Sequence, residues 1–323
     1  MSKALFLIKS KLPFFILGMM LFGISLGSFN DLSFLKILVT PTLFLMIYPM
    51  MINLKITDLF KGLAKPKTII LSITINFIAS PLLAFLLGKL FFSNYPMLMV
   101  GLMLISVIPT SGMTASWTGL AKGDMKSAIL IMSANLLLSI ILIPFYMNIF
   151  LGKVISINTM AIILNLLKVV VIPLILGDIT RRIILSKIGN DGFKAIKPNL
   201  SAISSIGVLL IVFIAMALKS KTIINQGGLV LYSIIPLTIY YGGLLILSIF
   251  IGRKSLNREN KIALVYGTTM RNLTIALALS LSGFGQSLAV FIIALGYIIQ
   301  VPLAAFYMQV LNNQNYNYNY SYH

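Results

Sequence analysis

The chain contains no cysteine, and its only histidine is His323, the last residue. Disulfide bonds and thiolate metal sites are therefore excluded, and a lone terminal histidine predicts neither a zinc site nor a catalytic base. The sequence accordingly predicts no metal site and no cofactor. Serine and threonine hydroxyls in apolar segments lack a base to activate them, so the protein is also expected not to be an enzyme.

Charged residues are scarce: 10% of the 323 residues are Asp, Glu, Lys or Arg, against about 25% in soluble domains. Hydrophobic residues make up 59% and form blocks of about 18–25 residues, the length that crosses a hydrocarbon core of about 30 Å. The pattern predicts an all-α integral membrane protein with about ten transmembrane helices. The expected spans are residues 12–29, 36–54, 68–92, 97–119, 126–150, 157–178, 199–218, 228–251, 262–283 and 287–311.

Positive charges alternate between the two sets of connecting segments. Eighteen Lys and Arg residues lie in one set and four in the other, and such an excess marks the cytoplasmic side. The protein is therefore expected to be a multi-pass protein of the cell (plasma) membrane with both termini cytoplasmic. Orientation and contact with anionic membrane lipids account for the net charge of +19, so no nucleic-acid partner is predicted. The sequence carries no signal for an oligomeric state.

The basic loop at residues 179–198 divides the chain into halves of five crossings each. An odd number of crossings per half inverts the second half relative to the first, an architecture common in secondary transporters. Two pairs of segments agree in order and spacing: 112–121 with 269–278, and 143–147 with 301–308. We therefore expect one transmembrane domain, residues 1–311, with repeat one at 1–150 and repeat two at 157–311. The Asn/Tyr-rich tail, residues 312–323, is expected to be disordered.

Two spans carry helix-breaking, polar centres at corresponding places, residues 109–112 in the fourth span and 267–272 in the ninth. Broken membrane helices survive only beside protein or a water-filled cavity, and paired breaks in two repeats are typical of a transport site. The predicted substrate-binding residues are Thr110, Ser111, Thr114, Ser116, Thr268, Thr269, Arg271 and Asn272.

Arg271 lies near the middle of its span, where a charge costs at least about 2.5–3.5 kcal/mol and usually marks a functional interior. Its guanidinium either binds an anionic substrate, permanently fills the place of a cation, or is a structural group held by carbonyls of the broken helices. The six acidic residues all lie in loops or at helix ends, so ion coupling through a buried carboxylate is not expected. Possible cavity-lining residues are Asn76, Asn135, Lys168 and Gln300.

Five motifs are distributed over nearly the whole chain. They are LMIYP at 45–49, NFIASP at 76–81, WTGLAKGD at 117–124, IPLILG at 172–177 with Arg181, and the run from Asn272 to Pro302. These motifs resemble the superfamily of bile acid/sodium symporters and arsenite permeases, nearer the arsenite permease (arsenical resistance) branch. The resemblance implies ten helices in two inverted five-helix repeats, with helices four and nine broken. It also implies that a panel and a core domain move against each other.

The chain departs from both branches at the residues that matter most. By this resemblance, Thr110 stands where the arsenite permease branch has a cysteine, and Gln300 stands where that branch has an acidic residue. The symporter branch has a Glu-x-Gly-x-Gln-Asn signature in the ninth span; here its Glu is Gly267, its Gln is Arg271, and its Asn is kept as Asn272. The resemblance therefore implies a variant that does not depend on a carboxylate sodium site.

Together these observations predict a secondary transporter that moves a small anion or organic acid by alternating access. Arsenite or metalloid efflux through hydroxyl groups is the first alternative. A channel-like or sensory membrane protein without alternating access is the alternative from a different class.

Overall fold

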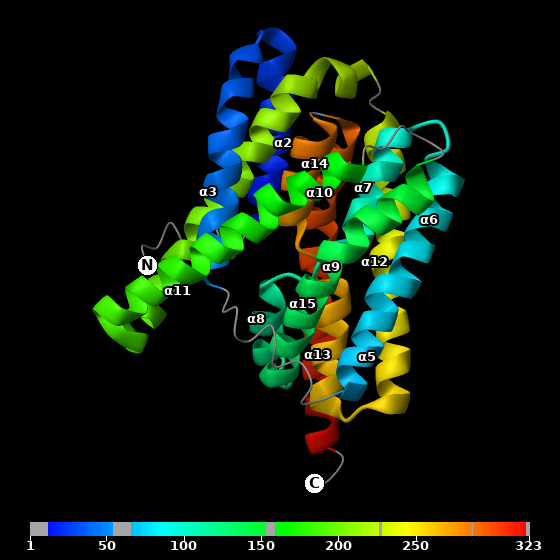
Figure 1. The fold of residues 1–323 in the computed structure, drawn as a ribbon. Helices are drawn as coiled ribbons and strands as arrows, with labels where there is room; N and C mark the ends of the chain where they lie inside the picture. Colours follow the sequence, from blue (N-terminus) through cyan, green and yellow to red (C-terminus); the bar gives the residue numbers. More distant parts are fainter. Residues whose placement is uncertain (1–11, 54–65, 153–158, 226–227, 286, 321–323) are drawn as a thin grey trace. The chain divides into compact units, whose positions relative to one another are not determined.

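The computed structural model describes residues 12–53, 66–152, 159–225, 228–285 and 287–320, and all the named elements in them are helices (Figure 1). The predicted all-α class is thereby confirmed. The elements are α2 (Leu12–Phe29), η1 (Ser33–Leu38), α3 (Val39–Ile52), α5 (Pro66–Thr74), η3 (Ile75–Ala79), α6 (Ser80–Phe91), α7 (Pro96–Val107), α8 (Met113–Leu120), α9 (Met125–Leu151), α10 (Thr159–Leu166), η4 (Leu167–Val171), α11 (Ile172–Asn225), α12 (Gly228–Ser255), α13 (Arg258–Thr269), α14 (Leu273–Phe284) and α15 (Leu288–Tyr320).

Seven helices among the described residues are long and apolar enough to cross a membrane. The number is smaller than the predicted ten for two reasons. Residues 160–178 of the sixth predicted span and the whole seventh span, 199–218, belong to one helical stretch, Met160–Asn225, in which Gly189 adopts φ 67° and kinks α11. The predicted fourth and ninth spans appear as pairs of short helices, α7 with α8 and α13 with α14.

The helices group into two compact units, and each draws segments from both halves of the sequence. One unit comprises Met1–Ile56, Ile155–Ser233 and Thr274–Ile298; the other comprises Thr57–Val154, Ile234–Leu273 and Ile299–His323. We call them unit 1 and unit 2. Neither unit corresponds to one of the predicted repeats, and the division into inverted repeats stays a prediction.

In unit 1, α11 packs lengthwise against α2 and α3 (Figure 1). Glycines allow the backbones of these helices to approach closely. A Cβ added to Gly27 would lie 2.1 Å from the carbonyl oxygen of Ala217, and one added to Gly207 would lie 2.6 Å from Met46 Cα. Because lipid tails are as apolar as the helices, the hydrophobic effect does not hold helices together in a membrane. Van der Waals contact at such close approaches stabilises their packing instead.

Unit 2 contains both helix breaks. It also contains the third predicted span of the chain, residues 68–92, which carries a π-helical bulge, η3. The Tyr146 hydroxyl from α9 donates a hydrogen bond to the carbonyl of Phe77 within this bulge. Single π turns are frequent at functional sites because they rotate neighbouring side chains out of the regular pattern. Here the bulge contains Asn76, which is fully buried.

Candidate functional site

The two helix breaks in unit 2 are joined to each other through their backbones. The nitrogen of Ser111 donates to the carbonyl of Met270 at 2.8 Å, and that of Asn272 donates to the carbonyl of Pro109 at 2.9 Å. These bonds form a single antiparallel bridge between Thr110 and Arg271. An unpaired backbone group in an apolar environment costs several kcal/mol, so each interrupted helix satisfies the groups that the other leaves free.

Side chains then hydrogen-bond to a backbone carbonyl near the end of α13, that of Gly267. Thr110 Oγ1 and Asn76 Nδ2 both donate to the carbonyl of Gly267, at 2.9 and 3.0 Å. Asn135 Nδ2 donates to Thr110 Oγ1 at 2.7 Å and to Ser72 Oγ at 3.2 Å. Two of the polar residues predicted from the sequence, Thr110 and Asn76, therefore bond directly to this carbonyl, and a third, Asn135 on α9, is linked to it through Thr110.

Gly267 has no room for a side chain. A Cβ at this position would lie 2.7 Å from Ile131 Cγ2 on α9, closer than real Cβ contacts. A glutamate at this position would have to displace Ile131. The local packing thus accommodates the loss of the acidic residue that the symporter signature has here.

Gln300 on α15 holds the backbone of Arg271 at two points. Its Oε1 accepts from the nitrogen of Arg271 at 2.8 Å, and its Nε2 donates to the carbonyl of Arg271 at 3.1 Å. Gln300 is 2% exposed. This amide fixes the extended conformation of Arg271 without touching the guanidinium.

The guanidinium of Arg271 is 1% exposed, and no ion pair joins it to a carboxylate in the described part of the chain. Its Nη1 makes one long hydrogen bond, 3.5 Å, to the carbonyl of Ile108 at the end of α7. The Tyr240 hydroxyl, hydrogen-bonded to Ser80 Oγ at 2.7 Å, lies close enough to interact with the charge. Partial negative charge at the C-terminal end of α7 helps to stabilise the cation.

Other nitrogens and oxygens of the cluster remain unpaired. Nε and Nη2 of Arg271 have no hydrogen-bond acceptor among the described residues, and neither Asn76 Oδ1 nor Asn135 Oδ1 has a donor. All four atoms are buried. Nε and Nη2 form one edge of the guanidinium, and their two parallel N–H groups match a carboxylate bidentately.

The remaining predicted residues divide into three groups. Thr114 joins the cluster, donating to the carbonyl of Tyr266 at 3.3 Å. Thr268 and Thr269 are buried but bond to carbonyls of their own helix, and Ser111 Oγ accepts from a nearby backbone nitrogen. Ser116 in unit 2 and Lys168 in unit 1 have exposed side chains and do not contribute to the cluster as described.

Four residues of the cluster were not predicted: Ser72, Ser80, Ser106 and Tyr240. Ser80 Oγ donates to the carbonyl of Ser106 at 3.0 Å as well as pairing with Tyr240. Ser72, Asn76 and Ser80 are four residues apart, and this polar stripe on one face of an apolar span was the available signal. Tyr240 carried none, since tyrosines within membrane spans are common.

Comparison with known proteins assigns the chain to a family. A model described as the Sodium Bile acid symporter family matches residues 40–226, which is more than half of the chain. The chain belongs to the Sodium Bile acid symporter family. It is therefore a multi-pass membrane protein and a secondary transporter of a small-molecule substrate, not an enzyme.

Relatives of the chain are described with different functions. An "Arsenical-resistance protein Acr3" of Corynebacterium glutamicum is 26% identical over 90% of this chain and 85% of its own length. A protein with the same description from Alkaliphilus metalliredigens is 23% identical over 84% and 80%. A "Probable sodium/metabolite cotransporter BASS3, chloroplastic" of Oryza sativa is 21% identical over 74% and 55%. The resemblance to the arsenical-resistance branch is confirmed.

Proposed function

We propose that the protein moves a small organic acid or another small anion across the cell membrane by alternating access, without a carboxylate sodium site. The observation that supports this most directly is the unpaired Nε–Nη2 edge of Arg271 inside unit 2. A buried charge with no counter-charge is costly, and an anion bound at this edge supplies both the counter-charge and the missing acceptors. A carboxylate has the planar shape that two parallel N–H groups recognise.

The polar residues around Arg271 bond to protein backbone and leave its Nε–Nη2 edge free for the anion. Thr110 and Thr114 donate to carbonyls of α13, and Gln300 is engaged with the backbone of Arg271. The N-terminus of α8 begins at Met113 and that of α14 at Leu273, and half-helix N-termini favour anions. We assign Thr110, Ser111, Thr114, Arg271 and Asn272 to the substrate site.

Independence from sodium is supported by the same geometry. In transporters of this general type, broken-helix C-termini and carbonyls coordinate the coupling cation. Here a permanent cation, Arg271, donates to Ile108 at the end of α7, and Gly267 lacks space for a carboxylate side chain. A fixed positive charge at this place repels a second cation.

The movement we propose is a change in the arrangement of two rigid bodies. Units 1 and 2 are each compact, and each contains segments from both sequence halves, a division that two interlocked inverted repeats would produce. In this proposal the membrane is crossed about ten times. The pairs α7–α8 and α13–α14 each make one crossing, and the parts of α11 before and after Gly189 belong to two different crossings.

Efflux of arsenite is the second candidate because two curated relatives are described as arsenical-resistance proteins. Neutral arsenite would bind hydroxyls such as Thr110, since the chain has no cysteine. A channel without alternating access is the third candidate, and strict exchange stoichiometry excludes it.

Thermal stabilisation of the purified protein distinguishes these candidates, because a ligand that binds the folded state raises its apparent stability. The panel contains simple carboxylates, hydroxy acids that also offer donors to Asn76 and Asn135, arsenite, and sodium. We expect a carboxylate or hydroxy acid to stabilise the wild type and not Arg271→Gln. Stabilisation of both proteins by arsenite or sodium would instead assign Arg271 a structural role.

A further inference from the structure

The turn between α12 and α13 in unit 2 gathers positive charge around a buried hydroxyl. Arg253 and Lys254 end α12, and Arg258 and Lys261 begin α13. Glu259 is the only acidic residue between 253 and 261. The cluster belongs to the opposite end of α13 from Arg271 and takes no part in the site described above.

Lys261 is held at this place by packing. Its stem lies against Gly252, where an added Cβ would be 2.7 Å from Lys261 Cγ. The pKa of Lys261 is lowered below its ordinary value of 10.5, chiefly by burial and secondly by the nearby charges of Arg253 and Arg258. A lysine crowded by like charges gains from an anion placed among them.

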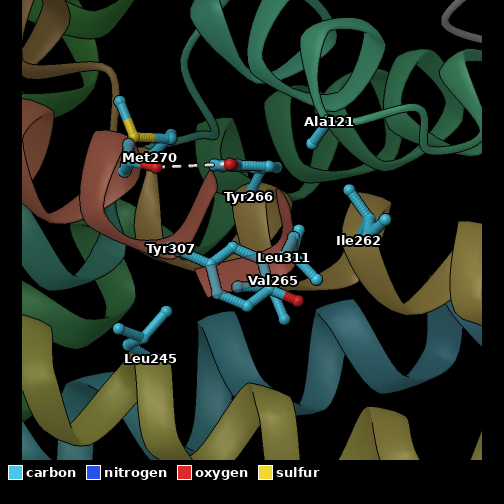
Figure 2. Close-up of a cluster of buried hydrophobic side chains, with 9 residues drawn as sticks. Ala121, Leu245, Ile262, Val265, Tyr266, Met270, Tyr307 and Leu311 are labelled. Atoms are coloured by element: carbon cyan, nitrogen blue, oxygen red, sulfur yellow. Dashed lines mark hydrogen bonds between the residues drawn. The ribbon is translucent and has the colours of Figure 1, made fainter. Parts of the chain in front are cut away.

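The hydroxyl of Tyr307 on α15 adds a neutral donor to this cluster. Tyr307 is 4% exposed, and its hydroxyl has no hydrogen-bond partner among the described residues. Arg253 and Arg258 are close enough to interact with it electrostatically. Figure 2 shows Tyr307 beside Tyr266, with which it makes an edge-to-face contact at 5.5 Å between ring centroids.

The cluster lies where membrane spans end. The last large apolar residue of α12 before the cations is Ile251, and α15 turns from apolar to polar residues after Leu311, so in this proposal the cations lie at the boundary between hydrocarbon and headgroups. Two large apolar side chains on the same two helices are exposed, Phe250 of α12 at 56% and Phe306 of α15 at 57%. Acyl chains can cover such residues while the headgroup meets the charges.

We propose that the α12–α13 turn binds the phosphate of an anionic lipid headgroup through Arg253, Lys261 and Tyr307. The phosphodiester accepts hydrogen bonds from all three side chains and offsets the repulsion among the cations. The lipid would thereby hold the start of α13, the helix whose other end carries Gly267. Lys254 takes no part, because its ammonium lies 4.3 Å over the ring of Phe250.

The test measures the thermal unfolding midpoint of the full-length protein in neutral detergent as phosphatidylglycerol, phosphatidylcholine or inorganic phosphate is added. We expect phosphatidylglycerol to raise the midpoint, and phosphatidylcholine to raise it much less because its choline cancels the charge of the phosphodiester. The double variant Arg253→Gln/Lys261→Gln should need at least about ten times more phosphatidylglycerol for the same shift, and Tyr307→Phe several times more. Lys254→Gln, which removes a charge from the same turn, should behave like the wild type.

Three outcomes would overturn the proposal. One is the absence of any shift with phosphatidylglycerol in the wild type. Another is an equal loss in Lys254→Gln and in the double variant, which would indicate bulk charge attraction rather than a built site. The third is full stabilisation by inorganic phosphate, which would make a soluble phosphate the ligand. If Arg253→Gln/Lys261→Gln fails to fold, Tyr307→Phe decides, since it keeps the ring and all charges.

Discussion

The amide of Gln300 is predicted to be essential for the extended backbone between α13 and α14. Gln300→Leu removes an acceptor 2.8 Å from the Arg271 nitrogen and a donor 3.1 Å from its carbonyl. The carbonyl keeps a second bond, from the nitrogen of Leu273 at 3.0 Å, but the buried nitrogen loses its acceptor. An orphaned donor costs about 1–3 kcal/mol and the lost second bond about 0.5–1.5 kcal/mol. We expect Gln300→Leu to lower the free energy of unfolding by about 2–4 kcal/mol.

The matched control is Gln300→Glu at a pH where the acid is protonated: it then keeps an acceptor for the Arg271 nitrogen and an O–H donor for its carbonyl, and should cost less than about 1.5 kcal/mol. Trp117 is the only tryptophan and stacks near Tyr266 with ring centroids 6.1 Å apart, so its fluorescence reports on unit 2. Denaturant unfolding in detergent, followed by this fluorescence, gives the difference. If the Leu and Glu variants unfold alike, the amide does not support the break and the reasoning is refuted.

Three further predictions concern other parts of the molecule. Thr110→Val should lower the free energy of unfolding by about 1–3 kcal/mol because Asn135 and Gly267 lose a partner, whereas Thr110→Ser should be tolerated; equal unfolding midpoints would contradict this. Gly207→Ala should destabilise the protein because a Cβ would meet Met46, whereas Gly18→Ala, with nothing within 4 Å, should not, as thermal unfolding would show. Because the pKa of Lys261 is lowered on folding, stability should rise with pH between that lowered pKa and 10.5, and Lys261→Gln should flatten the rise in a pH series.

Much of the membrane architecture follows from the sequence because apolar block length is dictated by bilayer thickness. The breaks at 109–112 and 267–272 were predictable too, since proline, glycine and hydroxyl residues interrupt otherwise apolar spans. Six of the predicted site residues meet in one network, Asn76, Thr110, Thr114, Asn135, Arg271 and Gln300, because polar side chains in apolar spans must find partners.

Other features depended on tertiary geometry that no local pattern encodes. The sequence does not show that Gln300 binds the backbone of Arg271 rather than its guanidinium, nor that Thr268 and Thr269 turn back to their own helix. Nor does it show that Ser116 lies on the exposed face of the short helix α8, away from the network of the other residues. The continuous run of α11 across residues 179–198 also differs from the predicted loop, since only Gly189 departs from helical geometry there.

The central claim is that Arg271 is the anion-binding group of a sodium-independent carrier. Its most direct test is uptake of the stabilising organic acid into proteoliposomes, with and without sodium, for the wild type, Arg271→Lys and Arg271→Gln. We predict saturable wild-type uptake that is equal in both media, uptake at least about tenfold lower in Arg271→Gln, and an intermediate rate in Arg271→Lys, which keeps the charge but not the paired N–H edge. Uptake that requires sodium, or that persists unchanged in a folded Arg271→Gln protein, would contradict the account.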